Sequence, residues 1–195
     1  MNLPNKLTVL RIFLIPIFIV VLTVPFQWGE LNFGGAVLPV TQLIAAIIFA
    51  GASLTDFVDG QIARREKLVT NFGKFADPLA DKMLVMTAFI ILVSMSKVPA
   101  WVAAIIICRE LAVTGLRLIV VENDGKVIAA AMPGKIKTTT QMLSIIFLLL
   151  NNIFFAAIGI PFGEILLYIC LFFTVYSGVD YFMNSKQIFA DSFDK

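Results

Sequence analysis

Long apolar runs, separated by short polar or turn-forming segments, make up most of this chain. The pattern predicts six helices, at residues 7–26, 38–64, 77–97, 99–121, 135–155 and 161–186. Each run is close to the length of about 20 residues that a helix needs to cross a bilayer. No internal repeat or low-complexity linker marks a second domain. Residues 1–195 are therefore interpreted as one domain.

The amino-acid composition indicates that these helices lie in a membrane. Of the 195 residues, 59% are hydrophobic and only 14% are charged, whereas soluble domains are about 25% charged. The mean hydropathy is +0.95. The first run is long enough to span, and no small-residue cleavage site follows it, so we expect a retained helix and not a signal peptide. The sequence predicts an all-α integral membrane protein with six transmembrane helices.

Basic residues gather in alternate loops of this arrangement. Most lie near the chain ends, after the second helix or after the fourth, and they include Lys6, Arg64, Arg65, Lys67, Lys74, Lys126, Lys135, Lys137, Lys186 and Lys195. The loops on the opposite side hold Lys97 and no other Lys or Arg. Because positive loops stay in the cytoplasm, both termini are predicted to be cytoplasmic.

Two acidic segments interrupt the apolar pattern on that same side. They are "TDFVDGQIAR" at residues 55–64 and "GKFADPLADK" at residues 73–82. An ionisable residue at the centre of a membrane span costs about 2.5–3.5 kcal/mol on insertion scales, so such residues usually have a function. The spacings of Asp56 with Asp59 and of Asp77 with Asp81 put each pair on one helical face. We expect the four carboxylates to meet at the cytoplasmic membrane edge.

Four carboxylates in a partly desolvated site need cations to offset their repulsion. An all-oxygen ligand set favours Mg²⁺ or Mn²⁺ over zinc, and four carboxylates suit two ions, an arrangement used for displacement at phosphorus. The chain has no histidine, so a general base is expected to be a carboxylate, a lysine, a tyrosine or a metal-bound water. Ordinary helix-end charges would explain one aspartate but not four at this spacing.

Small and basic residues accompany the aspartates. A glycine inside a helix costs about 1 kcal/mol relative to alanine, so Gly60, followed by Ala63 on the next turn, indicates close approach of a ligand or of another backbone. Arg64 can pair with a phosphate or hold an aspartate in place.

The full pattern is Asp56-x2-Asp59-Gly60-x2-Ala63-Arg64-x8-Gly73-x3-Asp77-x3-Asp81. It resembles the signature of the CDP-alcohol phosphatidyltransferase family at every fixed position. The resemblance implies a membrane enzyme, often a homodimer, that transfers the phosphatidyl group of a CDP-linked lipid to an alcohol and releases CMP. It also implies that the aspartates bind two divalent ions, that Asp81 is the base, and that the CDP-lipid lies against Gly60, Ala63, Arg64 and Gly73.

A second cluster, of basic residues, bears on the acceptor alcohol. Arg109 and Arg117 in "CRELAVTGLR" are eight residues apart and share a helical face, and Glu110 lies near enough to orient one of them. Lys135 and Lys137 in "GKIKTTTQM" begin the fifth helix. This cluster predicts an anionic acceptor that carries a phosphate. The lysines also fit a simpler role as topology signals.

The same two segments, with "NLPNKLTVLR", resemble the bacterial members of the family that use glycerol 3-phosphate. That resemblance implies CDP-diacylglycerol and glycerol 3-phosphate as substrates, membrane lipids and no nucleic acid as partners, and a bacterial cytoplasmic membrane with the site facing the cytoplasm. The sixth helix adds nothing specific to it. Alternatives are another acceptor, such as inositol phosphate or a phospholipid, a divalent-ion transporter, or a structural membrane protein with incidental charges.

Overall fold

The computed structural model describes residues 3–33, 35–66, 71–122 and 132–184. Inside these ranges, the side chains of residues 3–8, 33, 56–66, 71–78, 81, 118–122 and 184 are not described. The six α-helices are α1 Leu3–Thr23, α2 Val40–Glu66, α3 Asn71–Ser94, α4 Ala100–Glu122, α5 Met132–Leu149 and α6 Phe162–Asn184. The number and order of the predicted helices are confirmed.

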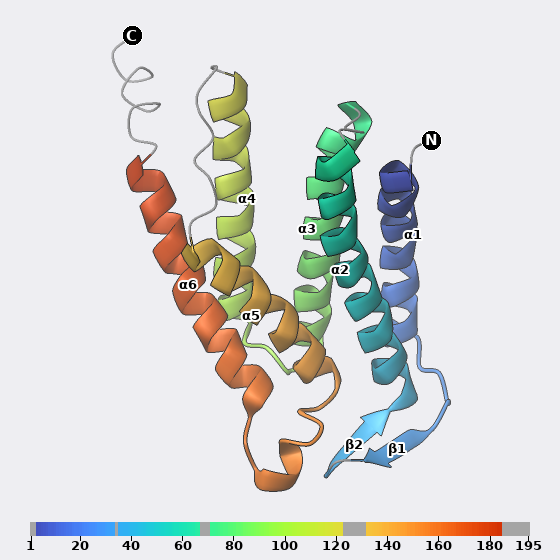
Figure 1. Cartoon of the computed structure of the whole chain (residues 1–195). Helices are drawn as coiled ribbons and strands as arrows, with labels where there is room; N and C mark the ends of the chain where they lie inside the picture. The colour runs from blue at the N-terminus through green and yellow to red at the C-terminus, as the bar shows by residue number, and fades with distance from the viewer. Residues whose placement is uncertain (1–2, 34, 67–70, 123–131, 185–195) are drawn as a thin grey trace.

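The helices run alternately up and down in one bundle (Figure 1). The start of α1, the end of α2, the start of α3, the end of α4 and the end of α6 lie at one end, which we call the signature end (Figure 1). The α3–α4 and α5–α6 connections lie at the opposite end. The helix α5 crosses the bundle obliquely, from α4 and α6 toward the lower parts of α2 and α3.

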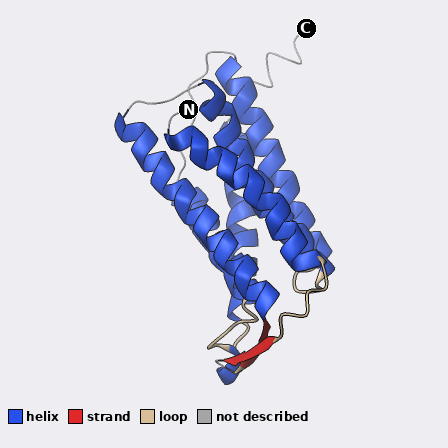
Figure 2. Ribbon diagram, turned by 90° about the vertical axis from the view of Figure 1, so that its right-hand side faces the viewer, coloured by secondary structure: helices blue, strands red, loops and turns tan. Residues whose placement is uncertain are grey.

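A β-hairpin at the end opposite the signature corrects the all-α prediction (Figure 2). Its strands are β1 Glu30–Phe33 and β2 Ala36–Pro39, paired antiparallel with Glu30 opposite Pro39. The two-residue connection is Gly-Gly, a sequence typical of tight hairpin turns. Gly35 has φ +79°, and a Cβ there would lie 2.6 Å from the Cα of Ala157. Only glycine therefore fits between the hairpin and the 3₁₀ helix η1, Ala156–Ile158.

Two predicted helix boundaries are wrong by six residues. The helix α3 begins at Asn71 and not at residue 77, because the first part of the helix is polar and shows no apolar run. The helix α5 ends at Leu149 and not at residue 155. Asn151, Asn152 and Phe154 have positive φ angles, which are incompatible with a continuing right-handed helix.

Among the described side chains, the main hydrophobic core lies between the helices. Its large, fully buried side chains include Phe18, Phe49, Phe89, Leu92, Ile106, Ile145, Leu149 and Leu167. The rings of Phe18 on α1 and Phe49 on α2 have centroids 6.3 Å apart. This packing holds α1, α2 and α3 together and leaves α4, α5 and α6 to enclose a polar cavity with α3.

By length and composition, one helix segment among the described residues can cross a bilayer, Phe162–Met183 in α6. Shorter apolar segments occupy Val9–Thr23, Val40–Thr55 and Lys82–Ser94. The six-span topology therefore stays a prediction.

Candidate active site

The signature residues lie on two consecutive helices. Asp56, Asp59, Gly60, Ala63 and Arg64 belong to α2, and Gly73, Asp77 and Asp81 belong to α3. The end of α2 and the start of α3 meet at the signature end of the bundle (Figure 1). The side chains of all eight residues lie outside the described part, so the metal cluster and the CDP-lipid contacts stay predictions. Among the side chains that are described, no group of three or more candidate metal ligands occurs.

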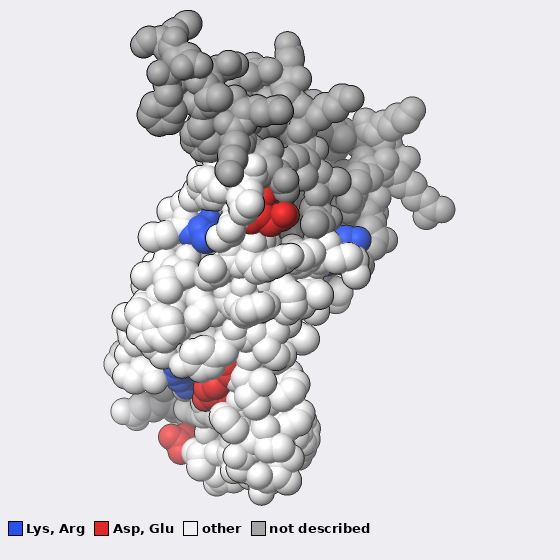
Figure 3. All heavy atoms as spheres, turned by 90° about the vertical axis from the view of Figure 1, so that its left-hand side faces the viewer, with Lys and Arg blue, Asp and Glu red and all other residues white. Residues whose placement is uncertain are grey.

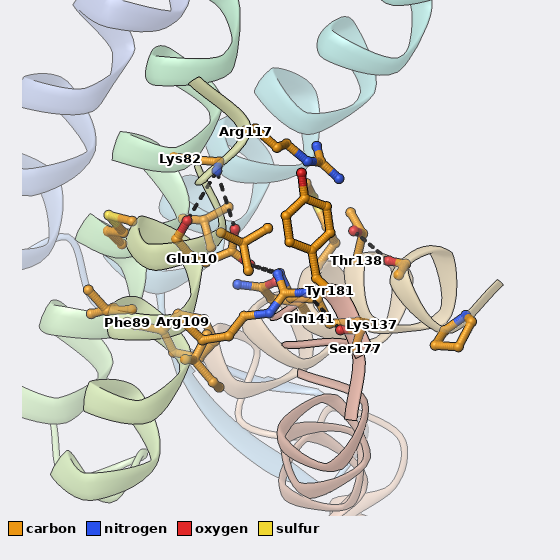
Figure 4. Close-up of a pocket in the computed structure, with 18 of the residues that line it drawn as sticks. Lys82, Phe89, Arg109, Glu110, Arg117, Lys137, Thr138, Gln141, Ser177 and Tyr181 are labelled. Carbon is orange, nitrogen blue, oxygen red and sulfur yellow. Dashed lines mark hydrogen bonds and ion pairs between the residues drawn. The ribbon is translucent and has the colours of Figure 1, made fainter. Parts of the chain in front are cut away.

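A cavity of about 260 Å³ lies among α3, α4, α5 and α6. Its wall on α3 begins at Lys82, directly after Asp81 in the sequence, and continues through Val85, Met86 and Phe89. The polar lining comes from all four helices and comprises Lys82, Arg109, Glu110, Arg117, Lys137, Thr138, Gln141, Ser177, Asp180 and Tyr181. We call this space the basic cavity (Figure 4).

Glu110 on α4 connects three of the cations that line the basic cavity. It forms ion pairs with Lys82 of α3 at 3.7 Å, with Arg109 at 3.7 Å, and with Lys137 of α5. Lys82 also donates to the Glu110 carbonyl at 3.4 Å and to the Thr114 hydroxyl. One carboxylate thereby holds cationic side chains from three helices in a common position.

Arg109 is fixed from the opposite side by α6. Its Nε donates to the Thr174 carbonyl at 3.1 Å, and its Nη2 donates to the Ser177 hydroxyl at 2.8 Å. A Cβ on Gly178 would lie 3.2 Å from the Arg109 Cγ, so the glycine leaves room for the arginine stem. Arg109 is therefore both a wall of the basic cavity and a link between α4 and α6.

Arg117 and Tyr181 meet at the side of the basic cavity nearer the signature end. The Arg117 Cζ lies 5.6 Å from the centroid of the Tyr181 ring, within the range of a cation–π contact. Tyr181 packs in turn on Val113 and Leu116 of α4. The predicted common face of Arg109 and Arg117 is confirmed, since both line the basic cavity.

The two lysines of α5 separate. Lys137 is 5% exposed and lines the basic cavity, whereas Lys135 is exposed and is not among the lining residues. Helix geometry explains the difference, because residues two apart point to different sides of a helix. Of the two, only Lys137 lines the basic cavity, and the prediction that they hold one ligand stays a prediction.

The basic cavity carries a surplus of positive charge. Among the described residues, four cationic side chains (Lys82, Arg109, Arg117 and Lys137) and two acidic side chains (Glu110 and Asp180) line it, a difference of +2. Such a site favours an anion that can accept several hydrogen bonds, as a phosphate does.

Several lining residues escaped the sequence analysis. Lys82 follows the aspartate signature directly, and Ser177, Asp180 and Tyr181 lie in α6, whose apolar sequence carries no specific motif. The signal was present in the segment "SGVDY", where Asp180 places an ionisable group in an apolar run. The aromatic and hydroxyl groups around it could be assigned only after α4 and α6 were seen to pack together.

Comparison with known proteins identifies the class of the protein. The family model for CDP-alcohol phosphatidyltransferase matches residues 1–176, which contain the whole signature and the lining of the basic cavity except Ser177, Asp180 and Tyr181. The chain belongs to the CDP-alcohol phosphatidyltransferase family.

Individual relatives are similar over nearly their full length. The chain is 53% identical over 186 residues to the CDP-diacylglycerol–glycerol-3-phosphate 3-phosphatidyltransferase of Bacillus subtilis, covering 95% of this chain and 96% of the relative. It is 38% identical to the protein of the same name from Rickettsia bellii, covering 96% and 97%. With the one from Salmonella paratyphi A it shares 36% identity over 95% of each chain.

Proposed function

We propose that this protein transfers the phosphatidyl group of CDP-diacylglycerol to glycerol 3-phosphate, giving phosphatidylglycerophosphate and CMP. Membership of the family supports the reaction type, and the names of the similar proteins support the two substrates. The observation in the structure that supports the choice of acceptor is the basic cavity, whose described side chains sum to a charge of +2. A phosphate monoester carries about −1.5 to −2 charge at pH 7, so the charges match.

The size of the basic cavity also supports a small acceptor. Pockets that hold drug-sized ligands are about 300–1,000 Å³, and this cavity is about 260 Å³. A compact phosphorylated alcohol suits that space better than a whole phospholipid does. Inositol phosphate, with a larger ring, is the rival acceptor that the test below must exclude.

In the proposed reaction the acceptor hydroxyl oxygen forms a bond to the phosphatidyl phosphorus, and the bond from that phosphorus to the CMP oxygen breaks. The hydroxyl proton passes to Asp81, which directly precedes Lys82 on the cavity wall in sequence. A carboxylate suits this role in a chain without histidine. Gly60, Ala63, Arg64 and Gly73 are proposed to hold the CDP-lipid.

Two divalent ions, Mg²⁺ or Mn²⁺, are proposed to bind to Asp56, Asp59, Asp77 and Asp81. The support is the type and spacing of the ligands, all of them carboxylates on consecutive helices. Bound there, the ions would offset negative charge on the diphosphate of the donor.

The basic cavity is proposed to bind the acceptor phosphate before reaction. Its cations are already held by Glu110 and Ser177, so little side-chain ordering would be required when the ligand binds. Such preorganised charge is worth more than flexible charge at a site from which water is excluded. Lys135 is omitted from the proposed phosphate site, and Lys82 is added.

We further propose that the six helices span the bacterial cytoplasmic membrane, with both termini and the active site at the cytoplasmic face. Figure 3 shows charged atoms at two levels of the visible face, separated by a broad uncharged belt. Large apolar side chains such as Phe172 and Val179 of α6 point outward, as lipid contact requires. A homodimer is proposed from family resemblance alone.

The test is release of CMP from CDP-diacylglycerol by purified protein in detergent micelles. We expect release to need both glycerol 3-phosphate and Mg²⁺ or Mn²⁺, to stop with EDTA and to return when Mg²⁺ is restored. Zinc should substitute poorly, because the ligands include no nitrogen or sulfur. Equal CMP release with inositol phosphate would contradict the assignment of glycerol 3-phosphate as the acceptor. Full activity after thorough chelation would exclude the metal proposal. Absence of metal-dependent CMP release under every acceptor would favour a transporter.

A further inference from the structure

The hydroxyl group of Tyr181 is buried without a hydrogen-bond partner. Tyr181 is 7% exposed, and its Oη makes no hydrogen bond in the structure. Buried tyrosine hydroxyls normally find a partner, and each exception calls for an explanation. Because Tyr181 lines the basic cavity, a ligand in that cavity is the natural partner.

Packing of the Tyr181 ring fixes the position of this hydroxyl. The ring lies against Val113 and Leu116, both of them buried on α4. One helical turn earlier, Ser177 accepts a hydrogen bond from Arg109, which ties the same stretch of α6 to α4. These contacts position the Tyr181 ring on α4, with Tyr181 at the wall of the basic cavity.

The surroundings of the hydroxyl indicate the chemistry of its missing partner. In Figure 4 the hydroxyl end of Tyr181 points toward Arg117, whose guanidinium carbon lies 5.6 Å from the ring centroid. A phenol hydroxyl and a guanidinium side by side are both hydrogen-bond donors. The group that both can contact is an anionic oxygen.

We infer that Tyr181 is an acceptor-binding residue, whose hydroxyl donates a hydrogen bond to a phosphate oxygen of the acceptor. Its ring contacts Arg117 at the same time. The inference rests on the proposed function, because it requires a phosphorylated acceptor in the basic cavity. It gives α6 a direct part in substrate binding that its apolar sequence does not suggest.

The test is the variant Tyr181→Phe, which removes the hydroxyl and keeps the ring. The matched control is Tyr176→Phe on the same helix, where the tyrosine is 55% exposed and does not line the cavity. The KM for glycerol 3-phosphate should rise roughly 10- to 100-fold in Tyr181→Phe, as expected for loss of a hydrogen bond to a charged group. The KM for CDP-diacylglycerol should not change. Inorganic phosphate, used as a competitor of glycerol 3-phosphate, should lose affinity in parallel.

The outcomes separate this inference from the proposed function. If the wild-type protein releases no CMP in response to glycerol 3-phosphate, the proposed function fails and this inference fails with it. If the wild type responds and Tyr181→Phe keeps the wild-type KM for glycerol 3-phosphate, only the inference is overturned. An equal rise in the KM of both substrates, or a similar rise in Tyr176→Phe, also overturns it, since that result would reflect structure and not contact with phosphate.

Discussion

A single lysine, Lys97, lies toward the hairpin end of the helix bundle, and the basic side chains of the basic cavity lie toward the signature end; their hydrogen bonding differs. At the hairpin end, the Lys97 ammonium donates to Gln42 Oε1 at 2.8 Å, to the Leu148 carbonyl at 2.8 Å and to Asn151 Oδ1 at 2.5 Å. An ammonium has three hydrogens, so all of them are used within the protein. In the basic cavity, four cations share two acids.

The difference separates a structural cation from a ligand-binding cluster. Lys97 joins the α3–α4 connection to α2 and to the end of α5, and Asn151 extends the network to the hairpin by donating to the Val37 carbonyl at 2.7 Å. Nothing about Lys97 calls for a ligand. Among the described residues, the lining of the basic cavity has more basic than acidic side chains, and it includes a buried hydroxyl without a hydrogen-bond partner. Changes at Lys97 should therefore affect stability, and changes at the cavity should affect catalysis.

The largest effect is expected beside the basic cavity, at the aspartates. Asp81→Asn should reduce transfer by about 10²–10⁴-fold or more, the range for loss of a general base. Asp59→Asn, which removes a proposed metal ligand, should abolish transfer as well, and both variants should stay folded. The measurement is CMP release by purified variants that elute normally in gel filtration. Near-normal turnover in either variant would contradict the two-metal proposal.

The companion variants Asp56→Asn and Asp77→Asn sharpen this prediction. They should act mainly through metal affinity, so activity should recover in part when Mg²⁺ is raised. If none of the four substitutions alters the metal dependence, the metal site lies elsewhere.

The next effect separates the two lysines of α5. Lys137→Met should lower kcat/KM for glycerol 3-phosphate about 10- to 100-fold, because a charge-assisted hydrogen bond contributes about 1.5–3 kcal/mol. Lys135→Met is the matched control and should change it little, since Lys135 lies outside the basic cavity. Initial rates at saturating CDP-diacylglycerol give both values. Equal losses in the two variants would mean that general surface charge, and not the basic cavity, attracts the acceptor.

A smaller effect, on stability, is expected at the other end. Lys97→Met removes three hydrogen bonds and should destabilise the protein by about 1–3 kcal/mol, which lowers the melting temperature by several degrees. The KM for glycerol 3-phosphate should be unchanged. Thermal unfolding in detergent and acceptor kinetics test the two halves of the statement. A shifted acceptor KM with unchanged melting would reverse the roles assigned to the two regions.

The smallest expected effect is a pH dependence of the protein's stability that arises from Lys97. Burial lowers the pKa of Lys97 from 10.5 to about 8, although Glu164 acts in the opposite direction. Between those two pH values the folded protein holds fewer protons at this site than the unfolded chain, so the Lys97 contribution to stability should rise as the pH increases from about 8 to 10.5. The comparison is the melting temperature of wild type and Lys97→Met across this range. A parallel pH profile in the two proteins would exclude a depressed pKa at Lys97.

The sequence was sufficient for the parts of the fold that depend on local pattern. Apolar runs located all six helices, and the spacing of Arg109 and Arg117 predicted their common face. The early start of α3 was missed because its first turns, including Gly73, are polar. The hairpin was missed because strands of four residues give too short an alternation to stand out beside long apolar runs.

The parts that failed depend on contacts between distant segments. Lys135 and Lys137 look equivalent in sequence, and only the orientation of α5 in the bundle separates them. Tyr181 resembles the other tyrosines of α6 until its ring is seen against Val113 and Leu116. The eight signature residues were recognised by resemblance to the family signature, and their side chains lie outside the described residues, so their roles stay predictions.

The central claim, that the basic cavity binds the phosphate of the acceptor, is tested most directly by comparing glycerol 3-phosphate with glycerol as acceptors. The quantity to measure is the ratio of their kcat/KM values, in wild type and in Arg117→Ala, at saturating CDP-diacylglycerol. The wild type should strongly prefer glycerol 3-phosphate, and Arg117→Ala should reduce that preference roughly 10- to 100-fold by lowering the rate with glycerol 3-phosphate alone. An unchanged ratio, with both acceptors equally slowed or neither affected, would contradict the claim.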